Sequence, residues 1–525
     1  GNIKVVGDRN FAMGMNKPIV HVMTHNPWVD RKPGMTLGSI GLFFQRDQTW
    51  FSQSKAWVDY MARVSALLQQ GKPVTDIAVF IGEEVPRRSI LPDRLVSSLP
   101  GIFGKERVAS EKLRLGNKGQ PQRVMPVGVG HSANMADPED WTDALRGYKY
   151  DCFNRDVLLK AKVLNGEVVF PSGASYKILV FPGKMLMNPN GNLMSSEVAK
   201  KILELKEAGA TIIIEKRAVN TIGLKEKDAV LQKAWEQLFV KSGKGSVVET
   251  PYMEETFESL GVARDIDVTA ENHAIAWTHR KLGNADLYFI SNQQRKQVSV
   301  PVSFRLTDFT PELWDPVSGK IKRTQWEVRG ERTYLTLSLD ANESVFVIFK
   351  QTAEKVPGPT ATAVVNQLAH INTNWLVQFD KGFGGPAEVV SFPKLVLWNE
   401  HENPAIKYYS GQATYANRFE LREVPKGRPV YLSIDSVFNI ATVIINGIDC
   451  GTFWTPPYQL DISKAIKPGN NTIEIKVSNT WANRLIGDMS LPEDKRVTWT
   501  TAPLNLLEGK PLLKAGLEGE IKIWQ

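Results

Sequence analysis

The sequence VTDIAVFIG, residues 74–82, is a nearly continuous run of apolar side chains. Such a run suits a strand of a parallel sheet covered by helices, because neither of its faces then meets water. Further strands are predicted at 176–181 and 211–214, and helices near 153–163 and 195–208. Ser195 or Ser196 can cap the second helix, and Gly209 suits its end. This alternation predicts a parallel, doubly wound α/β domain over residues 73–250.

A single βα unit is predicted on the N-terminal side. The segment NKPIVHVMTH, residues 16–25, is expected to be a buried strand. After a loop rich in Gly and Pro, a helix is predicted over residues 47–70. Five apolar residues recur on one face of this helix, namely Trp50, Trp57, Met61, Val64 and Leu68.

On the C-terminal side the apolar pattern changes to period two, which is typical of antiparallel strands. Strands at 286–292, 298–304, 333–339 and 345–349 predict an antiparallel β-sandwich over residues 251–355. Residues 353–362 are expected to form a linker. The remainder, 356–525, is again all-β, with strands at 430–434, 442–445, 472–477 and 519–524 and a hairpin turn at Asn446-Gly447.

Composition excludes several functional classes. The 525 residues allow three or four domains at ~150 residues each. The 64 Lys and Arg exceed the 56 Asp and Glu, but without a long basic run, so nucleic-acid binding is not expected. No stretch has the ~20 apolar residues of a membrane helix, and we expect no secretion signal in the first thirty residues. The only cysteines, Cys152 and Cys450, support neither a zinc site nor a disulfide framework.

Two histidines at the N-terminal strand are candidate site residues. His21 and His25 would point to the same side, and Asn26, Pro27 and Trp28 follow directly. If the strand belongs to a β/α barrel, His25, Asn26 and Trp28 lie at the active-site rim. Alternatively, His21 is a core histidine and Trp28 a packing residue. The pair lacks a third ligand at motif spacing, so we predict no metal site here.

Two further motifs are weaker. Glu83 and Glu84 follow the strand at 74–82, but neighbouring residues on an extended chain point to opposite sides. They are therefore poor candidates for a facing acid/base pair, and a solvated loop is the expected alternative. The segment GVGHSAN, residues 128–134, resembles a phosphate-binding loop only superficially, because no strand precedes it.

The last domain carries tryptophans beside polar side chains. They are Trp454 in GTFWTPP and Trp481, Asn483, Arg484 and Asp488 in NTWANRLIGD. Indole rings pack on the C–H faces of sugars, while planar polar groups pair with sugar hydroxyls. These five residues are predicted sugar contacts, and burial between two sheets is the alternative.

Taken together, these segments resemble the bacterial α-L-rhamnosidases of glycoside hydrolase family 106. The resemblance rests on the stretches GDRNF and GMN (7–16), HVMTHNPW (21–28), PGMT (33–36), residues 41–50, LLQQG (67–71), PELWDPVSG (311–319) and residues 479–488. It covers essentially the whole chain, in order.

The resemblance implies an architecture that agrees with the patterns above. Residues 1–72 would be the C-terminal βα part of a (β/α)8 catalytic barrel, 73–250 a flavodoxin-like domain and 251–355 a β-sandwich. Residues 356–525 would be a jelly-roll, galactose-binding-like domain. A whole barrel needs about 200 or more residues, so we expect the catalytic carboxylates upstream of Gly1 and assign none in this chain.

The same resemblance implies a secreted or periplasmic enzyme that removes terminal α-L-rhamnose from glycans by inversion, often with calcium. It implies substrate contacts at His25, Trp28 and, further, His21 and Arg46, whereas Asp8 and Asp47 are expected to be structural. With the barrel incomplete, the face bearing Trp50 and Trp57 is expected to be exposed. A non-catalytic glycan-binding scaffold and a β-galactosidase-like exo-glycosidase are the alternatives, and the oligomeric state is not predicted.

Overall fold

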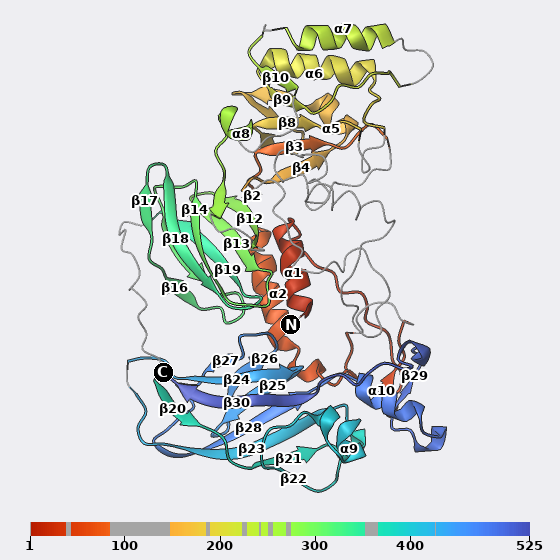
Figure 1. Cartoon of the computed structure of the whole chain (residues 1–525), viewed down its shortest axis with the longest axis vertical. Helices are drawn as coiled ribbons and strands as arrows, with labels where there is room; N and C mark the ends of the chain where they lie inside the picture. The colour runs from red at the N-terminus through yellow and green to blue at the C-terminus, as the bar shows by residue number, and fades with distance from the viewer. Residues whose placement is uncertain are drawn as a thin grey trace.

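The computed structural model describes residues 2–37, 44–84, 147–184, 190–222, 228–240, 243–249, 256–268, 275–351, 366–425 and 427–525. Figure 1 shows an α/β layer at one end of the long axis, a β-sandwich in the middle and a second sandwich at the other end. The predicted linker at 353–362 and the segment 128–134 lie outside the described residues.

The α/β layer is built on a parallel sheet, which in the described residues has the order β10-β9-β8-β3-β4. Its strands are β3 (Ile77–Phe80), β4 (Tyr150–Phe153), β8 (Ile178–Phe181), β9 (Thr211–Ile214) and β10 (Ser246–Glu249). All residues of β3 and β8 are buried, as expected for covered strands. Numbered along the chain, the strands follow the order 2-1-3-4-5, which flavodoxin-type sheets also have.

Helices cover this sheet as the apolar pattern predicts. They are α5 (Arg155–Lys160), α6 (Ser196–Ala208), α7 (Asp228–Leu238) and the short α8 (Thr256–Ser259). Ser195 caps α6 by accepting a hydrogen bond from the backbone N–H of Val198, and Gly209 ends it in the left-handed conformation. A small antiparallel sheet of β5 (Lys162–Leu164), β6 (Glu167–Val169) and β7 (Ser175–Tyr176) was not predicted.

The middle β-sandwich has two antiparallel sheets. One contains β11 (Ile266–Val268), β14 (Val298–Phe304), β18 (Arg332–Leu339) and β17 (Glu327–Arg329). The other contains β16 (Ile321–Arg323), β15 (Thr310–Trp314), β19 (Ser344–Lys350), β13 (Ala285–Asn292), β12 (Ile275–Leu282) and β2 (Lys72–Pro73). The pairing of β2 with β12 ties the N-terminal segment to this sandwich.

Two N-terminal helices cover the outer face of the β2-containing sheet. They are α1 (Asn2–Ala12) and α2 (Lys55–Leu68), which is preceded by the short helix η1 (Phe51–Gln53). Their buried side chains form one core with sheet residues and with Ile440 and Trp454 from the last sandwich. Trp50 and Trp57 are half-buried against that core, so the expectation of an exposed face is wrong. The two sandwiches cover it.

A buried ion pair fixes α1. Lys4 Nζ lies 2.7 Å from Asp8 Oδ2, one helical turn away, and both side chains are at most 1% exposed. Asp8 also accepts hydrogen bonds from Ser291 in β13 and from Tyr60 in α2. The structural role expected for Asp8 is therefore confirmed.

The strand predicted at 16–25 is absent. These residues have no regular secondary structure, and Ile19 and Met23 are 89% and 75% exposed. A strand is stable where a neighbour pairs its backbone N–H and C=O groups. Within the described ranges no strand lies beside this segment. Of the predicted βα unit, the helix is therefore present and the strand is not.

The last sandwich also has two antiparallel sheets. One contains β20 (Gln367–His370), β30 (Gly516–Trp524), β24 (Tyr431–Phe438) and β27 (Gln459–Asp461). The other contains β22 (Val390–Phe392), β21 (Trp375–Phe379), β23 (Gln412–Leu421), β28 (Gly469–Ser478), β25 (Ile440–Ile445) and β26 (Ile448–Phe453). The predicted Asn446-Gly447 turn joins β25 to β26, with positive φ at both residues. Outside the sheets lie α9 (Pro404–Lys407) and α10 (Ala482–Met489).

Candidate functional site

The predicted N-terminal site residues lie on an irregular segment between α1 and α2. His21 and His25 are exposed, and neither side chain makes a hydrogen bond or ion pair within the described ranges. Trp28 is half-buried. The structure brings Arg46 to Trp28, since its Nη2 donates to the Trp28 carbonyl oxygen at 3.0 Å. Arg46 thus holds the backbone of the predicted rim, and its side chain remains about half exposed (56%).

Asn26 anchors the same segment from inside. It is 6% exposed, and its Nδ2 donates to Asp47 Oδ2 at 2.8 Å. Arg46 Nη2 donates to the Asn26 carbonyl oxygen at 2.9 Å, and Arg46 Nε lies 3.6 Å from the same Asp47 carboxylate oxygen. The expected structural role of Asp47 is confirmed, because its carboxylate fixes the loop that carries His25 and Trp28.

A short parallel ladder joins this segment to the C-terminal part of the chain. It pairs β1 (Pro33–Gly34) with β29 (Trp499–Thr500). The N–H of Trp499 donates to the Lys32 carbonyl oxygen at 2.8 Å, and the N–H of Thr36 donates to Thr501 Oγ1 at 2.9 Å. Residues near opposite ends of the sequence thereby form one surface.

An aromatic cluster stands on that surface. The rings of Trp28 and Trp499 meet edge to face with centroids 5.0 Å apart. The Arg31 guanidinium carbon lies 5.2 Å from the Trp28 centroid and 5.4 Å from that of Trp499. Arg31 is exposed, and Trp499 is 37% exposed. Flat rings beside a fork of N–H donors can hold a sugar ring by its C–H face and its hydroxyls.

The five polar and aromatic residues predicted as sugar contacts in the last domain are instead buried. Their exposures are Trp454 8%, Trp481 5%, Asn483 1%, Arg484 7% and Asp488 1%. The ring of Trp454 packs 5.2 Å from that of Tyr60, and Trp481 Nε1 donates to the Asp47 carbonyl oxygen at 2.8 Å. Asn483 exchanges two hydrogen bonds with the backbone of Leu513. These residues therefore do not form the exposed sugar-binding surface that was expected of them, because their side chains make contacts inside the protein.

Asp488 nevertheless helps to position the aromatic cluster. Its Oδ2 accepts hydrogen bonds from the N–H of Val497 at 3.0 Å and from the N–H and Oγ1 of Thr498, both at 2.7 Å. Its Oδ1 lies 2.7 Å from Arg484 Nη2 as a buried ion pair. The residues directly before Trp499 are therefore clamped to α10.

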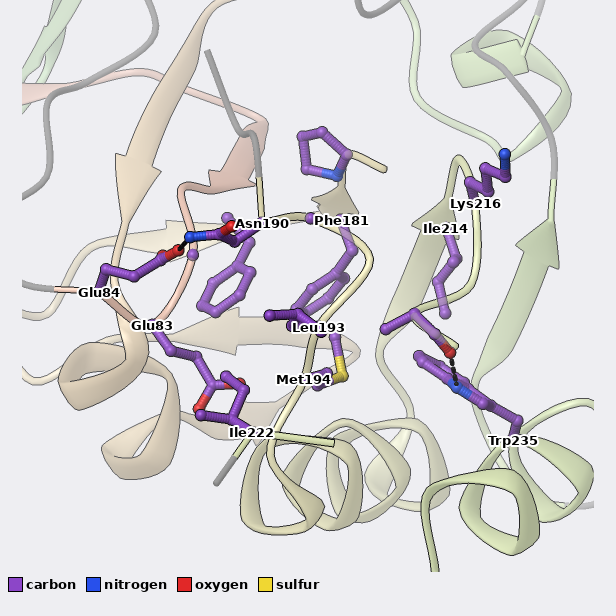
Figure 2. A pocket seen from close by; sticks show the side chains of 15 residues that line it. Glu83, Glu84, Phe181, Asn190, Leu193, Met194, Ile214, Lys216, Ile222 and Trp235 are labelled. Atoms are coloured by element: carbon purple, nitrogen blue, oxygen red, sulfur yellow. Dashed lines mark hydrogen bonds between the residues drawn. The ribbon is translucent and has the colours of Figure 1, made fainter. Parts of the chain in front are cut away.

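A second candidate site is a pocket of about 180 Å³ in the α/β layer. It lies where β3, β8 and β9 end, which includes the switch point of the strand order, where doubly wound sheets bind ligands. Figure 2 shows Phe181, Leu193, Met194 and Ile214 along its walls. The walls are thus largely apolar.

The two adjacent glutamates line this pocket but do not form a facing acid/base pair. Glu83 accepts a hydrogen bond from the Ser195 N–H at 2.7 Å, and its other oxygen lies 3.6 Å from Arg155 Nε. Its side chain is 9% exposed, so the solvated loop expected for it is wrong. Glu84 accepts a hydrogen bond from Asn190 Nδ2 at 2.5 Å (Figure 2). Both carboxylates have structural partners.

No ligands for the calcium ion implied by the family resemblance are assigned among the described residues. They contain no cluster of three or more His, Cys, Asp or Glu side chains that could bind a metal ion. The Asp47 carboxylate, which anchors the predicted rim, is occupied by Asn26 and Arg46. We derive no step through calcium. None of the described helices has the length and apolar character needed to cross a bilayer.

Comparison with known proteins identifies the chain's relatives. A family model described as alpha-L-rhamnosidase matches residues 1–116 and 130–328, and a model described as the galactose-binding domain-like part of glycosyl hydrolase 2 proteins matches 395–500. The rhamnosidase structure from Novosphingobium sp. PP1Y superposes with a TM-score of 0.80 at 32% identity, over 99% of this chain and 45% of that one. A Formosa agariphila protein provisionally named a beta-glucuronidase is 22% identical, over 94% of this chain and 57% of that one.

These matches define the class as a multidomain protein of the glycoside hydrolase type. Within it, the chain belongs to glycoside hydrolase family 106, the alpha-L-rhamnosidase family. It spans about half the length of the relatives it matches.

Two residues of the surface cluster, Arg31 and Trp499, escaped the sequence analysis. Each stands in a segment without local periodicity, and only the β1–β29 ladder brings them together. A tryptophan between β-branched residues, in Val497-Thr-Trp-Thr500, was the available sign of a short strand.

Proposed function

We propose that this chain is part of an exo-acting glycoside hydrolase that removes terminal α-L-rhamnose from polysaccharides or glycosides with inversion. The observation that carries the proposal is the match of nearly the whole chain to a solved rhamnosidase at a TM-score of 0.80. The rim supports it, since the half-buried Trp28 offers an aromatic ring and the exposed Arg31 offers N–H donors to a sugar, with the exposed His25 beside them.

Inversion needs two carboxyl groups on opposite sides of the scissile bond. One protonates the leaving oxygen while the other activates water across a gap of about 6.5–9.5 Å. We assign neither group among the described residues, and we propose that both belong to the part of the relatives' length that this chain does not span. In this proposal the described residues orient the substrate, and Asp47 and Asn26 hold the rim in place.

The finer architecture forms part of the same proposal. We propose that residues 1–72 complete a (β/α)8 barrel, with a flavodoxin-like domain at 73–250, a sandwich at 251–355 and a jelly roll at 356–525. A periplasmic or extracellular location follows from the substrate, because rhamnose-containing polysaccharides lie outside the cytoplasm.

One finding favours a second function. The match of residues 395–500 to a galactose-binding domain-like model agrees with a glycan-binding scaffold that has no hydrolytic activity of its own. The two functions differ in turnover and not in binding.

The test is release of the chromophore from an aryl α-L-rhamnoside. We would assay this chain beside a form extended by the additional N-terminal sequence of its relatives, with an aryl β-glucuronide and an aryl β-galactoside as competing substrates. We expect the extended form to hydrolyse the rhamnoside alone.

Binding of rhamnose-containing glycans without turnover by either form would instead support the scaffold. Turnover of another glycoside would overturn the substrate assignment. Activity of the short chain would mean that it contains the catalytic acids, and Glu83→Gln and Glu84→Gln would then be the first variants to measure.

A further inference from the structure

Trp499 is unusual among the tryptophans of the last sandwich because it is exposed and yet fixed. It is 37% exposed and is the one tryptophan among the large hydrophobic residues that are exposed in the described ranges. Those that serve packing are almost fully covered, namely Trp375, Trp398, Trp454 and Trp481 at 1%, 0%, 8% and 5%. Indole left in contact with water in a well-held position is typical of a binding surface.

Trp499 is held in place by contacts of the residues on both sides of it in the sequence. The ladder with β1 holds Trp499 and Thr500, and the Asp488 carboxylate holds Val497 and Thr498. These bonds hold the backbone, and the edge-to-face contact with Trp28 holds the ring, so the indole loses little conformational freedom when a ligand binds. The cluster is therefore preorganised.

The chemistry of the cluster fits a sugar ring. Trp28 and Trp499 supply aromatic surface at an angle of 70° to each other. In the described part of the chain, the Arg31 guanidinium is not paired with a carboxylate, so its N–H groups remain available for hydroxyls. Aromatic surface with such donors selects a pyranose over an apolar ligand.

We propose that Trp28, Arg31 and Trp499 form a subsite for a pyranose ring on the aglycone side of the substrate. In exo-cleavage the terminal sugar enters the active site while the remaining glycan extends outward, where an open surface can hold it. The inference rests on the proposed function and deepens it. It assigns substrate recognition to Trp499, which lies near the opposite end of the sequence from the rim residues.

The test uses this chain labelled with 5-fluorotryptophan and oligosaccharides from a rhamnogalacturonan digest, with free L-rhamnose as a second probe. Trp28→Phe and Trp499→Phe assign the two fluorine resonances while keeping an aromatic ring. We expect the oligosaccharides to shift both resonances and Trp499→Ala to weaken binding about tenfold. Trp524→Ala is the matched control, because Trp524 packs on Tyr431 in the same sandwich, outside the cluster.

Three results would overturn the subsite. They are unchanged affinity in Trp499→Ala, shifts at tryptophans other than Trp28 and Trp499, and binding of no oligosaccharide. Each is compatible with hydrolysis of the aryl rhamnoside by the extended form, so the failure of this inference is distinguishable from failure of the proposed function. Free rhamnose shifting the two resonances as strongly as the oligosaccharides would overturn the aglycone-side assignment.

Discussion

His279 lies in the middle sandwich between two carboxylates. Its Nδ1 is 2.8 Å from Asp265 Oδ2 and its Nε2 is 2.9 Å from Asp286 Oδ1, with all three side chains at most 4% exposed. Burial opposes the charge on the imidazole, but the two aspartates outweigh it and raise the pKa of His279 to about 9. Tyr288 completes the cluster by donating to Asp265 at 2.7 Å.

The raised pKa of His279 makes the stability of the folded protein depend on pH. Because the folded value lies above the ordinary 6.5, the stabilisation is complete below pH 6.5 and is lost as pH rises through about 9. His279→Gln removes the charge and should lower the free energy of unfolding by roughly 3 kcal/mol at pH 6. Denaturant unfolding at pH 6, 8 and 10 should show this difference shrinking with pH.

His370→Gln is the matched control for that series. His370 is 30% exposed and 3.8 Å from Glu520, so its loss should change little at any of the three pH values. A deficit in His279→Gln that stays constant from pH 6 to pH 10 would contradict the charged imidazole.

Residues of the candidate site were predictable where a motif carries them. Trp28 and Arg46 stand in segments that resemble the family, and the structure brings them together. Trp499 was not predictable, because its partner Trp28 is near the other end of the chain and the two are joined by a ladder of two residue pairs. Trp481 illustrates the converse, since its sequence neighbourhood resembles a sugar site although the ring is buried.

At the scale of elements, apolar runs with sharp ends were predictable. β3 and β8 were correctly predicted because their burial on both faces makes every residue apolar. The segment 16–25 has apolar residues interleaved with polar ones and forms no strand. A strand depends on neighbours, which local sequence does not reveal, whereas α6 forms its hydrogen bonds within itself and was predicted to within a residue.

The pairing of β1 with β29 depends on a glycine. Gly34 has φ +85°, and a Cβ there would collide with the Asn26 side chain. Gly34→Ala should therefore lower the free energy of unfolding by more than the roughly 1–2 kcal/mol expected from left-handed strain alone, and it should weaken the β1–β29 pairing. Thermal unfolding and hydrogen exchange of the Trp499 N–H, which donates to Lys32, measure the two effects.

Gly14→Ala separates the collision from the strain. Gly14 has φ +100°, and a methyl group added there would meet nothing within 4 Å, so its replacement reports left-handed strain alone. Equal losses in the two variants would show that Asn26 yields to the methyl group and that the close approach is unimportant.

At the scale of the whole molecule, α1 and α2 join the two sandwiches. Trp454 reaches from the last sandwich to Tyr60 in α2, with ring centroids 5.2 Å apart. Both sandwiches were predictable from the sequence, but this contact was not, because the residues on its two sides share no sequence pattern.

Trp454→Ala should lower the free energy of unfolding by roughly 3–5 kcal/mol, the usual effect of removing a buried indole, and should weaken the contact between α2 and the last sandwich. Hydrogen exchange should then accelerate in α2 as well as in the last sandwich. Trp375→Ala provides the comparison, because Trp375 is 1% exposed in a core confined to the last sandwich. Unchanged exchange in α2 of Trp454→Ala would show that the helices are held by the middle sandwich alone.

The β1–β29 ladder also sets an order of events during synthesis. A ribosome adds about 5–20 residues per second, so Pro33 waits tens of seconds before Trp499 exists to pair with it. Until then the segment with His25 and Trp28 has no C-terminal partner, while the α/β layer and the middle sandwich already have all their described strands. The surface that carries Trp28 and Trp499 is therefore among the last parts of the described chain to mature. A nascent protein stalled before Trp499 would have those two cores without its rim.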